Sequence, residues 1–291
     1  MNASTPLFWR DPRLPQVELR CIGDARQVAY ARHSHAQWSL GAVTRGRSTF
    51  YYRDDTHAIC AGDLVMMNPG WVHACNPIEQ EPWAYLMLYV DTDWVSELRY
   101  RSGLSKSPEW QDIPTAALST PVLYRRYRRM AALLLDERAN LARKRGALTE
   151  TLLAVFSHVQ SGSERSSMKV PAPLERLAAY LDHHALERLT LERLCRISGY
   201  SSGHLIRAFK HHYGMTPRAY LINRRVQLGR EWLNQGHSIA ETALALGFND
   251  QPHFQRTFKR LLAATPHQYR THSTGKSALV QHDEQAAHGQ Q

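Results

Sequence analysis

The 291-residue chain lacks the features of several protein classes. Its four cysteines stand far apart with no Cys-x-x-Cys pair, which argues against a disulfide framework or a structural zinc site. No apolar run approaches the roughly 18 residues of a membrane span, and no basic segment followed by an apolar run opens the chain. A phosphate-cradling glycine loop and a serine or cysteine nucleophile motif are also missing. We therefore expect a cytoplasmic protein with reduced thiols and no membrane partner.

Acidic residues are scarce in one part of the chain. The net charge is +10, and residues 190–271 hold 12 Lys and Arg against 4 Asp and Glu, so +8 of this charge lies there. Such a stretch favours a polyanion such as nucleic acid, but it is also often only a solvated surface. Charge alone leaves both interpretations open.

The composition of residues 17–100 is typical of an antiparallel sheet or barrel. The segment is rich in Tyr, Trp, Val and Thr and is broken at short intervals by Gly, Pro, Asn and Asp. Ser48–Arg53 and Trp83–Val90 are predicted strands, with a turn at Asp54 and Asp55.

Two helices are predicted after the barrel. Apolar residues recur at helical spacing in two stripes, with a predicted loop near Lys144 to Gly146 between them. These stripes could cover the sheet, contact a second subunit, or do both. The stripes are Leu123, Tyr127, Met130 and Leu134, and then Leu148, Leu152, Val155 and Val159. Ser161–Pro173, rich in Ser, Gly and Pro, is a predicted linker.

The last third of the chain contains an internal repeat. Gly199–Tyr220 returns as Gly247–Tyr269, with Arg, Phe, Lys, Thr-Pro and Tyr at matching positions and one residue inserted after the glycine. Two copies are too few for a solenoid. They indicate two helical units of one design, each with a basic residue at the same place on its second helix. Such a pair would touch a polyanion at two separated points.

Capping residues predict where the helices of both units begin and end. Between the units, Thr216 and Pro217 begin a longer helix that runs to Gly236 and would hold the units at a fixed separation. The remaining signals are Thr190 as a cap, Gly199 as a stop, Ser201 or Ser202 as the next cap, a capping box of Ser238 and Glu241, a turn at Gly247, Asn249 or Asp250 as a cap, and Pro252 in the first turn.

These residues carry a family resemblance. The run Ser238–Arg270, SIAETALALGFNDQPHFQRTFKRLLAATPHQYR, resembles the signature of the AraC/XylS family of bacterial transcription regulators, and Thr190–Leu233 resembles the family's first unit and connecting helix. It combines a glycine turn, a following aromatic residue, Arg-x-Phe and Thr-Pro at fixed offsets, which chance seldom produces. The resemblance implies a non-catalytic protein whose two helix-turn-helix units bind successive major grooves of duplex DNA.

The resemblance, transferred residue by residue, implies base contacts in both units. Of these residues, Arg207, Gln255 and Arg256 have the donor geometry to read guanine and adenine edges. Lys210 and Lys259 are assigned to phosphate, although a solvated helix face or an internal ion pair explains them, and Arg224 and Arg225, equally well. The implied base-contact residues are Ser202, Gly203, Ile206 and Arg207 in the first unit, and Gln251, Pro252, Gln255 and Arg256 in the second.

A few positions depart from the family pattern. Gly203 and Ile206 offer little hydrogen bonding, so the first unit is expected to read thymine methyls and DNA shape. Ala263 stands where the family usually has glycine before Thr-Pro, which would cost about 1 kcal/mol if the backbone there is left-handed. Gly229 stands where the family favours alanine.

The N-terminal part resembles the cupin barrel that regulators of this family use as a sensor, on the evidence of Arg32–His35, Gly46 and Gly62–Asn76. Metal-binding cupins use three histidines and a carboxylate, but Ser39 stands at the carboxylate position here. Three imidazoles can hold zinc, yet family sensors more often line an effector pocket with these positions, so we expect no metal and no cofactor. The expected effector-binding residues are His33, His35, Trp38, Tyr51, Trp71 and His73, although the aromatic ones could equally fill the barrel.

The expected fold class is α+β, with a cupin-like antiparallel β-barrel and helix pair followed by an all-α domain with two helix-turn-helix units. We expect an effector-binding and dimerisation domain at 1–160, a linker at 161–173, a DNA-binding domain at 174–271 and a disordered tail at 272–291. The expected function is an effector-responsive transcription activator, a homodimer whose partners are promoter DNA, a small-molecule effector and RNA polymerase. A metal-dependent cupin enzyme with an appended DNA-binding domain is the alternative, and the missing carboxylate disfavours it. A DNA-compacting protein would leave the sensor-like half idle.

Overall fold

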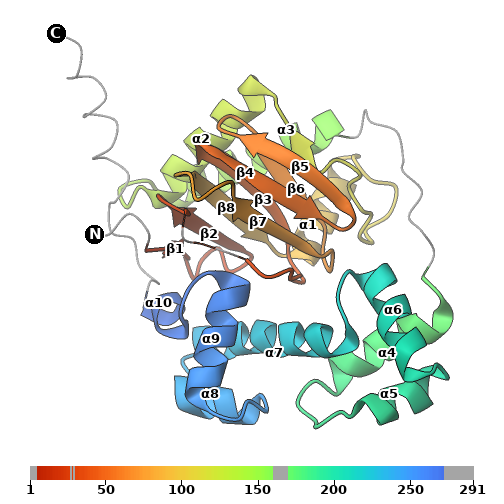
Figure 1. Cartoon of the computed structure of the whole chain (residues 1–291). Helices are drawn as coiled ribbons and strands as arrows, with labels where there is room; N and C mark the ends of the chain where they lie inside the picture. Colours follow the sequence, from red (N-terminus) through yellow and green to blue (C-terminus); the bar gives the residue numbers. More distant parts are fainter. Residues whose placement is uncertain (1–4, 27, 29, 160–169, 272–291) are drawn as a thin grey trace.

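The structure, a computed structural model, describes residues 5–26, 28, 30–159 and 170–271. It has an N-terminal β-domain in which two antiparallel sheets are stacked and a helix pair covers the larger sheet, and a C-terminal helical domain packed against one end (Figure 1). The α+β prediction is confirmed. Within the described residues, no helix is both long and apolar enough to cross a membrane.

The strands form sheets in the orders β1-β2-β8-β3-β6-β9 and β5-β4-β7. They are β1 (Leu7–Trp9), β2 (Val17–Ile22), β3 (Trp38–Arg45), β4 (Arg47–Tyr52), β5 (Asp55–Cys60), β6 (Leu64–Met67), β7 (His73–Pro77), β8 (Ala84–Val90) and β9 (Ala117–Leu118). The helices are α1 (Thr92–Arg101), α2 (Pro121–Leu135), α3 (Leu141–Val159), α4 (Ala172–His183), α5 (Leu191–Ser198), α6 (Ser202–Tyr213), α7 (Pro217–Asn234), α8 (Ile239–Ala245), α9 (Gln251–Leu262) and α10 (Pro266–Thr271).

The larger sheet is buried on both faces. In β8, Leu86 and Leu88 point into the core beneath the helix pair, whereas Tyr85 and Met87 point into the core between the two sheets. Successive side chains of a strand face opposite sides, so a strand buried on both needs an apolar residue at nearly every position. The run WAYLMLYV meets that need, and the predicted strand is confirmed.

The turn of the β4–β5 hairpin lies one residue earlier than predicted. Tyr52 pairs with Asp55, so the two loop residues are Arg53 and Asp54, and Asp55 already belongs to β5. Arg53 has a φ of 53°, in the left-handed region. A two-residue hairpin loop requires such a conformation. The register of the hairpin is set by how the two strands pair, and the residue types in the turn do not reveal this register.

Both predicted stripes of the helix pair are buried against the larger sheet, so covering the sheet accounts for them. The predicted loop at Lys144 to Gly146 is wrong, because both residues lie inside α3 and the connection is residues 136–140. Asn140 starts α3 by accepting a hydrogen bond from the backbone N–H of Arg143. The buried Lys144 ammonium then donates to the Leu134 carbonyl at 2.8 Å and satisfies the end of α2.

In the helical domain, α5–α6 and α8–α9 form the two predicted helix-turn-helix units, joined by α7 (Figure 1). Thr190, Thr216 and Asp250 accept N-cap hydrogen bonds, and Ser201 is an N-cap without a side-chain bond. Gly199 and Gly247 have φ values of 73° and 74°, so both predicted glycine turns are confirmed. Ser238 accepts from the Glu241 N–H and donates to the Glu241 carboxylate.

The predicted linker lies mainly outside the described residues, as does the predicted tail at 272–291. At its C-terminal end the linker prediction extended too far, because Pro173 belongs to the first turn of α4. Proline is compatible with that position since the first N–H groups of a helix have no partner within it.

Close packing explains Gly229. A Cβ atom at this position would lie 2.8 Å from Leu246 Cδ1 and 3.0 Å from Phe254 Cζ. The connecting helix α7 therefore approaches α8 and α9 too closely for the alanine that the family pattern favours.

Replacing Ala263 with glycine should stabilise the protein by about 0.5–1 kcal/mol. Ala263 ends α9 with φ 47°, a left-handed conformation that strains an alanine. The Ala263 methyl also packs against the β-domain core, and losing this contact limits the gain in the free energy of unfolding. Urea unfolding measures the effect. The matched control is Gly214→Ala at the equivalent position of the first unit. Gly214 has φ 69°, and an added Cβ would lie 3.0 Å from Val72 Cβ, so this substitution should destabilise the protein. Stabilisation by both substitutions, or by neither, would contradict the backbone argument.

The interface between the two domains combines aromatic packing with a buried cluster of charged side chains. Phe8 of β1 belongs to the same core cluster as Phe258 and Tyr269 of the helical domain, with 5.0 Å between the Phe8 and Tyr269 rings. The buried carboxylate of Glu18 accepts hydrogen bonds from Arg10 and the Tyr269 hydroxyl and lies 3.8 Å from Arg230. We call these contacts the domain interface.

Candidate functional site

The two candidate recognition helices, α6 and α9, stand at opposite ends of α7 (Figure 1). Their C-terminal ends contact the β-domain, because Gly214 lies against Val72 and Ala263 packs on the core between the sheets. Their first two turns, where the predicted base contacts lie, are therefore at the ends remote from the β-domain. Both are available to an external partner.

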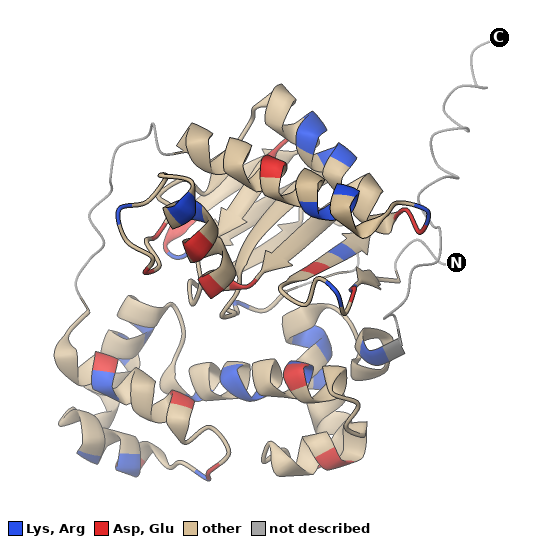
Figure 2. Ribbon diagram, turned by 180° about the vertical axis from the view of Figure 1, so that it is seen from behind, with Lys and Arg blue, Asp and Glu red and all other residues tan. Residues whose placement is uncertain are grey.

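Every predicted DNA-contact residue has an accessible side chain or backbone. The exposed ones are Ser202, Gly203, Ile206, Arg207, Lys210, Pro252, Arg256 and Lys259, while Gln251 and Gln255 are partly exposed. Within the described residues, Lys210 and Lys259 form no ion pair, which leaves both ammonium groups available to phosphate. Basic residues of the helical domain and of the helix pair are visible in Figure 2.

Arg225 is a structural residue. Its guanidinium donates to the carbonyls of Ala185 and Glu187 at 2.7 Å and of Gly247 at 3.2 Å. It thus fastens the start of the first unit to the turn of the second, and partial burial lowers its pKa. Arg224 lies 3.7 Å from Asp182. Arg224 thus forms the internal ion pair of the alternative interpretation, whereas Arg225 bonds to backbone carbonyls of both units and, together with α7, fixes their spacing.

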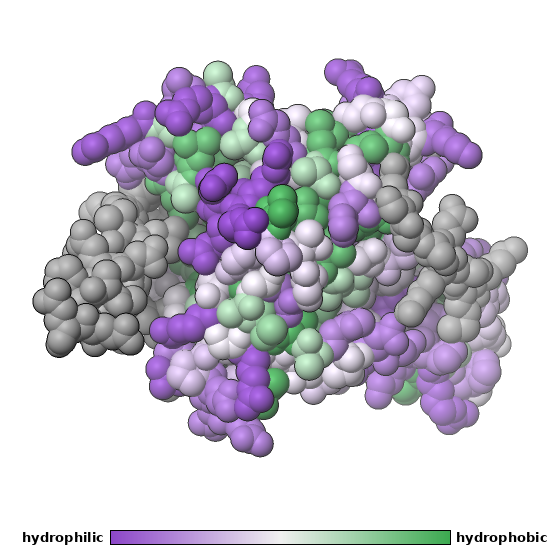
Figure 3. Space-filling view, turned by 90° about the horizontal axis from the view of Figure 1, so that it is seen from above, coloured by the Kyte–Doolittle hydropathy of each residue, from purple (hydrophilic) through white to green (hydrophobic). Residues whose placement is uncertain are grey.

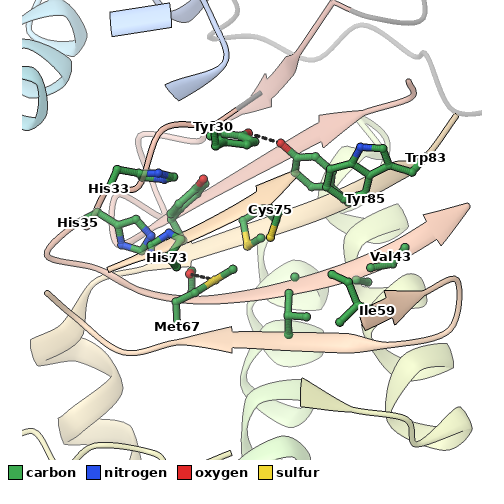
Figure 4. A pocket seen from close by; sticks show the side chains of 16 residues that line it. Tyr30, His33, His35, Val43, Ile59, Met67, His73, Cys75, Trp83 and Tyr85 are labelled. Atoms are coloured by element: carbon green, nitrogen blue, oxygen red, sulfur yellow. Dashed lines mark hydrogen bonds between the residues drawn. The ribbon is translucent and has the colours of Figure 1, made fainter. Parts of the chain in front are cut away.

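A second candidate site is a cavity between the two sheets of the β-domain (Figure 4). The space open to a water molecule is about 30 Å³, room for one or two waters. Thioethers, branched aliphatic chains and aromatic rings form most of its wall. The lining residues include His33, His35, Ser39, Val43, Val65, Met67, His73, Cys75, Trp83, Met87 and three tyrosines, Tyr30, Tyr85 and Tyr89.

Three histidines converge at one end of this cavity. The ring centre of His73 lies 4.5 Å from that of His33 and 4.8 Å from that of His35 (Figure 4). Each Nδ1 lies 2.8–2.9 Å from a nearby carbonyl, of Ala31, Gln37 and Trp71 respectively for His33, His35 and His73. Because a carbonyl only accepts, each Nδ1 carries the proton, and each Nε2 is left as an acceptor.

Burial keeps these imidazoles neutral. It lowers the pKa of His73 to about 4. The pKa values of His33 and His35 are also well below the usual range, first through burial and then through the charge of His73. The Nε2 atom of His35 is buried without a hydrogen-bond partner. This end of the cavity therefore presents unprotonated acceptors to a ligand that can donate.

The three predicted histidines line this cavity, but none of the three predicted aromatic side chains does. Trp38 lies on the opposite face of the larger sheet, packed 5.0 Å from Phe156 in the core beneath the helix pair. Tyr51 and Trp71 do not line the cavity; Trp71 stacks on Tyr52 outside it and donates to Asp112. The lining residues that the sequence prediction missed include Tyr85, Met87 and Tyr89 of β8. They share one face of β8, since alternate residues of a strand point the same way, but the uninterrupted apolar run does not indicate which face borders the cavity.

Among the described residues, no group of three or more His, Cys, Asp or Glu side chains has the geometry to hold a metal ion. Ser39, at the position where metal-binding cupins carry a carboxylate, is buried and donates to the Met67 sulfur at 3.1 Å.

The segment that carries two of the cavity histidines also contacts the helical domain. Ser34, between His33 and His35, is joined to Asn223 of α7 by hydrogen bonds from the amide to the Ser34 carbonyl and hydroxyl at 3.0 and 3.2 Å. Gln37 accepts from Arg230 of the same helix at 3.3 Å. One short segment thus lines the cavity on one side and binds the connecting helix on the other.

Comparisons with known proteins support these assignments. A family model described as an AraC-like ligand binding domain matches residues 17–156, and a helix-turn-helix domain model matches residues 194–272. The uncharacterized HTH-type transcriptional regulator YbfI of Bacillus subtilis is 26% identical over 260 residues, covering 87% of this chain and 90% of that protein. The HTH-type transcriptional activator RhaS of Pectobacterium carotovorum is 24% identical over 255 residues, covering 82% and 87%.

A solved structure shows the same arrangement of domains. ToxT from Vibrio cholerae superposes with a TM-score of 0.55 at 11% identity, covering 92% of this chain and 96% of that one. This likeness supports the fold alone. Together, the two matched domain models, the full-length relatives and the exposed pair of recognition helices show that the chain belongs to the AraC family of transcription regulators, with an N-terminal ligand-binding domain and a C-terminal helix-turn-helix DNA-binding domain.

Proposed function

We propose that this chain activates transcription in the cytoplasm when a small-molecule effector occupies the cavity of its β-domain. The main support for this proposal is the segment around Ser34, which lines the cavity and also binds α7. A ligand that moves His33 or His35 therefore acts on the helix that spaces the two DNA-binding units. We propose activation because the family relative RhaS is described as a transcriptional activator.

In the proposed DNA complex, the first two turns of α6 and of α9 enter the major groove. Arg207, Gln255 and Arg256 read base edges, assisted by Ser202 and Gln251. Gly203, Ile206 and Pro252 contact methyl groups and the groove wall, and Lys210 and Lys259 bind phosphate. The exposure of these residues and the fixed spacing set by α7 and Arg225 support this assignment.

The functional form is proposed to be a homodimer that contacts RNA polymerase, with the helix pair as the subunit contact. Figure 3 shows the face above the β-domain, where apolar patches lie among hydrophilic side chains. Between α2 and α3 lies an open groove that includes Val122, which is 62% exposed, and Leu133. The groove is also lined by four arginines, Arg125, Arg126, Arg129 and Arg143. A partner surface must therefore supply acidic groups opposite these arginines or leave them in contact with solvent.

Selection of binding sites from a random duplex pool tests the proposal. The purified full chain should recover a site with two blocks about one helical turn apart, because two linked recognition helices bind one side of the duplex. Binding that depends only on salt, with no enriched sequence, would count against a specific regulator.

Arg256→Ala should reduce the discrimination between the selected site and random DNA by about 1–3 kcal/mol. The side chain is exposed on the first half of α9, where its guanidinium can reach base edges. Titration of both duplexes at one salt concentration measures the effect. The matched control is Arg260→Ala, which removes the same charge from the last turn of α9 and should leave the ratio unchanged. Equal ratios for both variants and the parent would remove Arg256 from the base-reading set.

A further inference from the structure

Arg20 is a buried cation without an acidic partner among the described residues. Its side chain is in β2 and only 1% exposed, and its Nε and Nη2 atoms form no hydrogen bond. The acidic residue nearest in the strand, Glu18, is already bonded to Arg10 and Tyr269 and lies near Arg230. A guanidinium buried in this way is strongly unfavourable unless a partner compensates its charge.

The surroundings of Arg20 connect it to the cavity. Its guanidinium carbon lies 5.7 Å from the ring centre of Tyr30, and Tyr85 and Tyr89 are also close to the guanidinium. Tyr30, Tyr85 and Tyr89 all line the cavity. Arg20 therefore sits directly behind a wall of tyrosines, next to the end where His33 stacks on Tyr30 at 5.3 Å.

These tyrosines are hydrogen-bond donors, not counter-ions. Burial raises the pKa of Tyr30 to about 12, so its hydroxyl keeps the proton at neutral pH. The Tyr30 and Tyr85 hydroxyls are hydrogen-bonded to each other (Figure 4). If that bond opens, both hydroxyls can donate to an anion bound next to Arg20, and the charge of the guanidinium then has a partner.

We propose that the effector is a small carboxylic acid whose carboxylate pairs with Arg20 and the hydroxyls of Tyr30 and Tyr85. The inference rests on the proposed effector-binding function and names its ligand class. Away from the three histidine acceptors, the cavity wall, including Val43, Val65 and Met87, calls for an apolar body attached to the carboxylate. Since the open space is about 30 Å³, binding must widen the cavity, and the flexible Met67 and Met87 side chains can rearrange.

The domain interface offers a competing role for Arg20. Its guanidinium carbon is also 5.3 Å from the ring centre of Phe8, which packs on Tyr269 of the helical domain. A residue that only stacks on aromatic rings would stabilise the unliganded protein without distinguishing an acid from its amide. Discrimination between these two ligands therefore separates the two roles.

The test measures thermal shifts of the full-length protein with pairs of probes, 3-phenylpropanoate and hexanoate, each against its own carboxamide. We expect a carboxylate to raise the melting temperature in a saturable way and its amide to bind about tenfold more weakly or worse. Arg20→Met should abolish the preference for the acid. Arg45→Met, at an exposed position of β3, is the matched control and should keep it.

Three outcomes would overturn the inference. If the amides bind as well as the acids, or if Arg20→Met keeps the preference, the cavity binds an effector but Arg20 does not select a carboxylate. If neither series binds, the inference fails, and binding to the selected DNA site separately decides whether the protein is still a sequence-specific regulator. Should Arg20→Met not fold, Arg20→Gln replaces it, and an unchanged acid-to-amide ratio in that uncharged variant is the contradicting result.

Discussion

Glu18→Gln is expected to destabilise the protein by about 3 kcal/mol, because it leaves buried cations without their counter-ion. The carboxylate is 7% exposed, accepts from Arg10 at 2.7 Å and from Tyr269 at 2.9 Å, and lies 3.8 Å from Arg230, which is itself 7% exposed. Burial alone would raise the pKa of Glu18, but the attraction of Arg230 and Arg10 outweighs it and lowers the pKa. Urea unfolding followed by tryptophan fluorescence measures the loss.

Two further variants show whether the effect is electrostatic. Glu81→Gln removes an exposed ion pair with Arg47 and should leave the stability unchanged within error. Combining Glu18→Leu with Arg230→Met replaces opposite buried charges by apolar groups and should recover most of the loss. A Glu18→Gln variant as stable as the parent would mean that water already reaches Arg230 and that the domain interface is looser than described.

Acidification from pH 8 to pH 5 should cost about 2 kcal/mol through His73 alone, and more through His33 and His35. The folded-state pKa of His73 is about 4 because of burial, whereas an unfolded histidine titrates near 6.5. The unfolded state therefore binds protons that the folded state excludes. The stabilisation is complete above pH 6.5 and is lost as the pH falls toward 4. The pKa values of His33 and His35 are shifted in the same direction.

Urea midpoints at pH 8, 6.5 and 5 test this expectation. His73→Gln should flatten the pH dependence by the contribution of one histidine, because glutamine keeps a polar side chain and does not titrate in this range. The control His183→Gln changes an exposed histidine of α4 and should leave the pH dependence as it is. Parallel curves for the parent and His73→Gln would show that His73 is not buried neutral in solution.

The helical domain could be predicted from the sequence nearly element by element. Its signals are local, since a cap, a glycine turn and an apolar stripe each act within a few residues of the chain. Thr190, Thr216 and Asp250 cap helices as predicted, and Gly199 and Gly247 make the turns. The exposed DNA-contact candidates follow from the same local pattern, because helix periodicity decides which residues face away from the core.

The sequence also predicted the histidines of the cavity but only part of its wall. His33 and His35 are two residues apart in one segment, and His73 lies in the second cupin-like segment, Gly62–Asn76, so motif spacing was informative. Trp38 points into the core beneath the helix pair and Tyr85 into the core between the sheets, and sequence spacing cannot show this difference. Both lie in strands buried on both faces, where hydrophobic runs carry no alternation that would tell which face borders the cavity.

The sequence by itself determined the two domains, the two helix-turn-helix units and the histidine cluster, because each depends on patterns within a few tens of residues. The tertiary structure decided the contacts between distant segments: Ser34 with Asn223, Glu18 with Arg230, and Arg20 beside Tyr30 and Tyr89. These depend on how one domain packs on the other and how the two sheets stack, and no local propensity encodes such packing. The same packing buries Arg20, and that buried charge is what identifies the chemistry of the proposed effector.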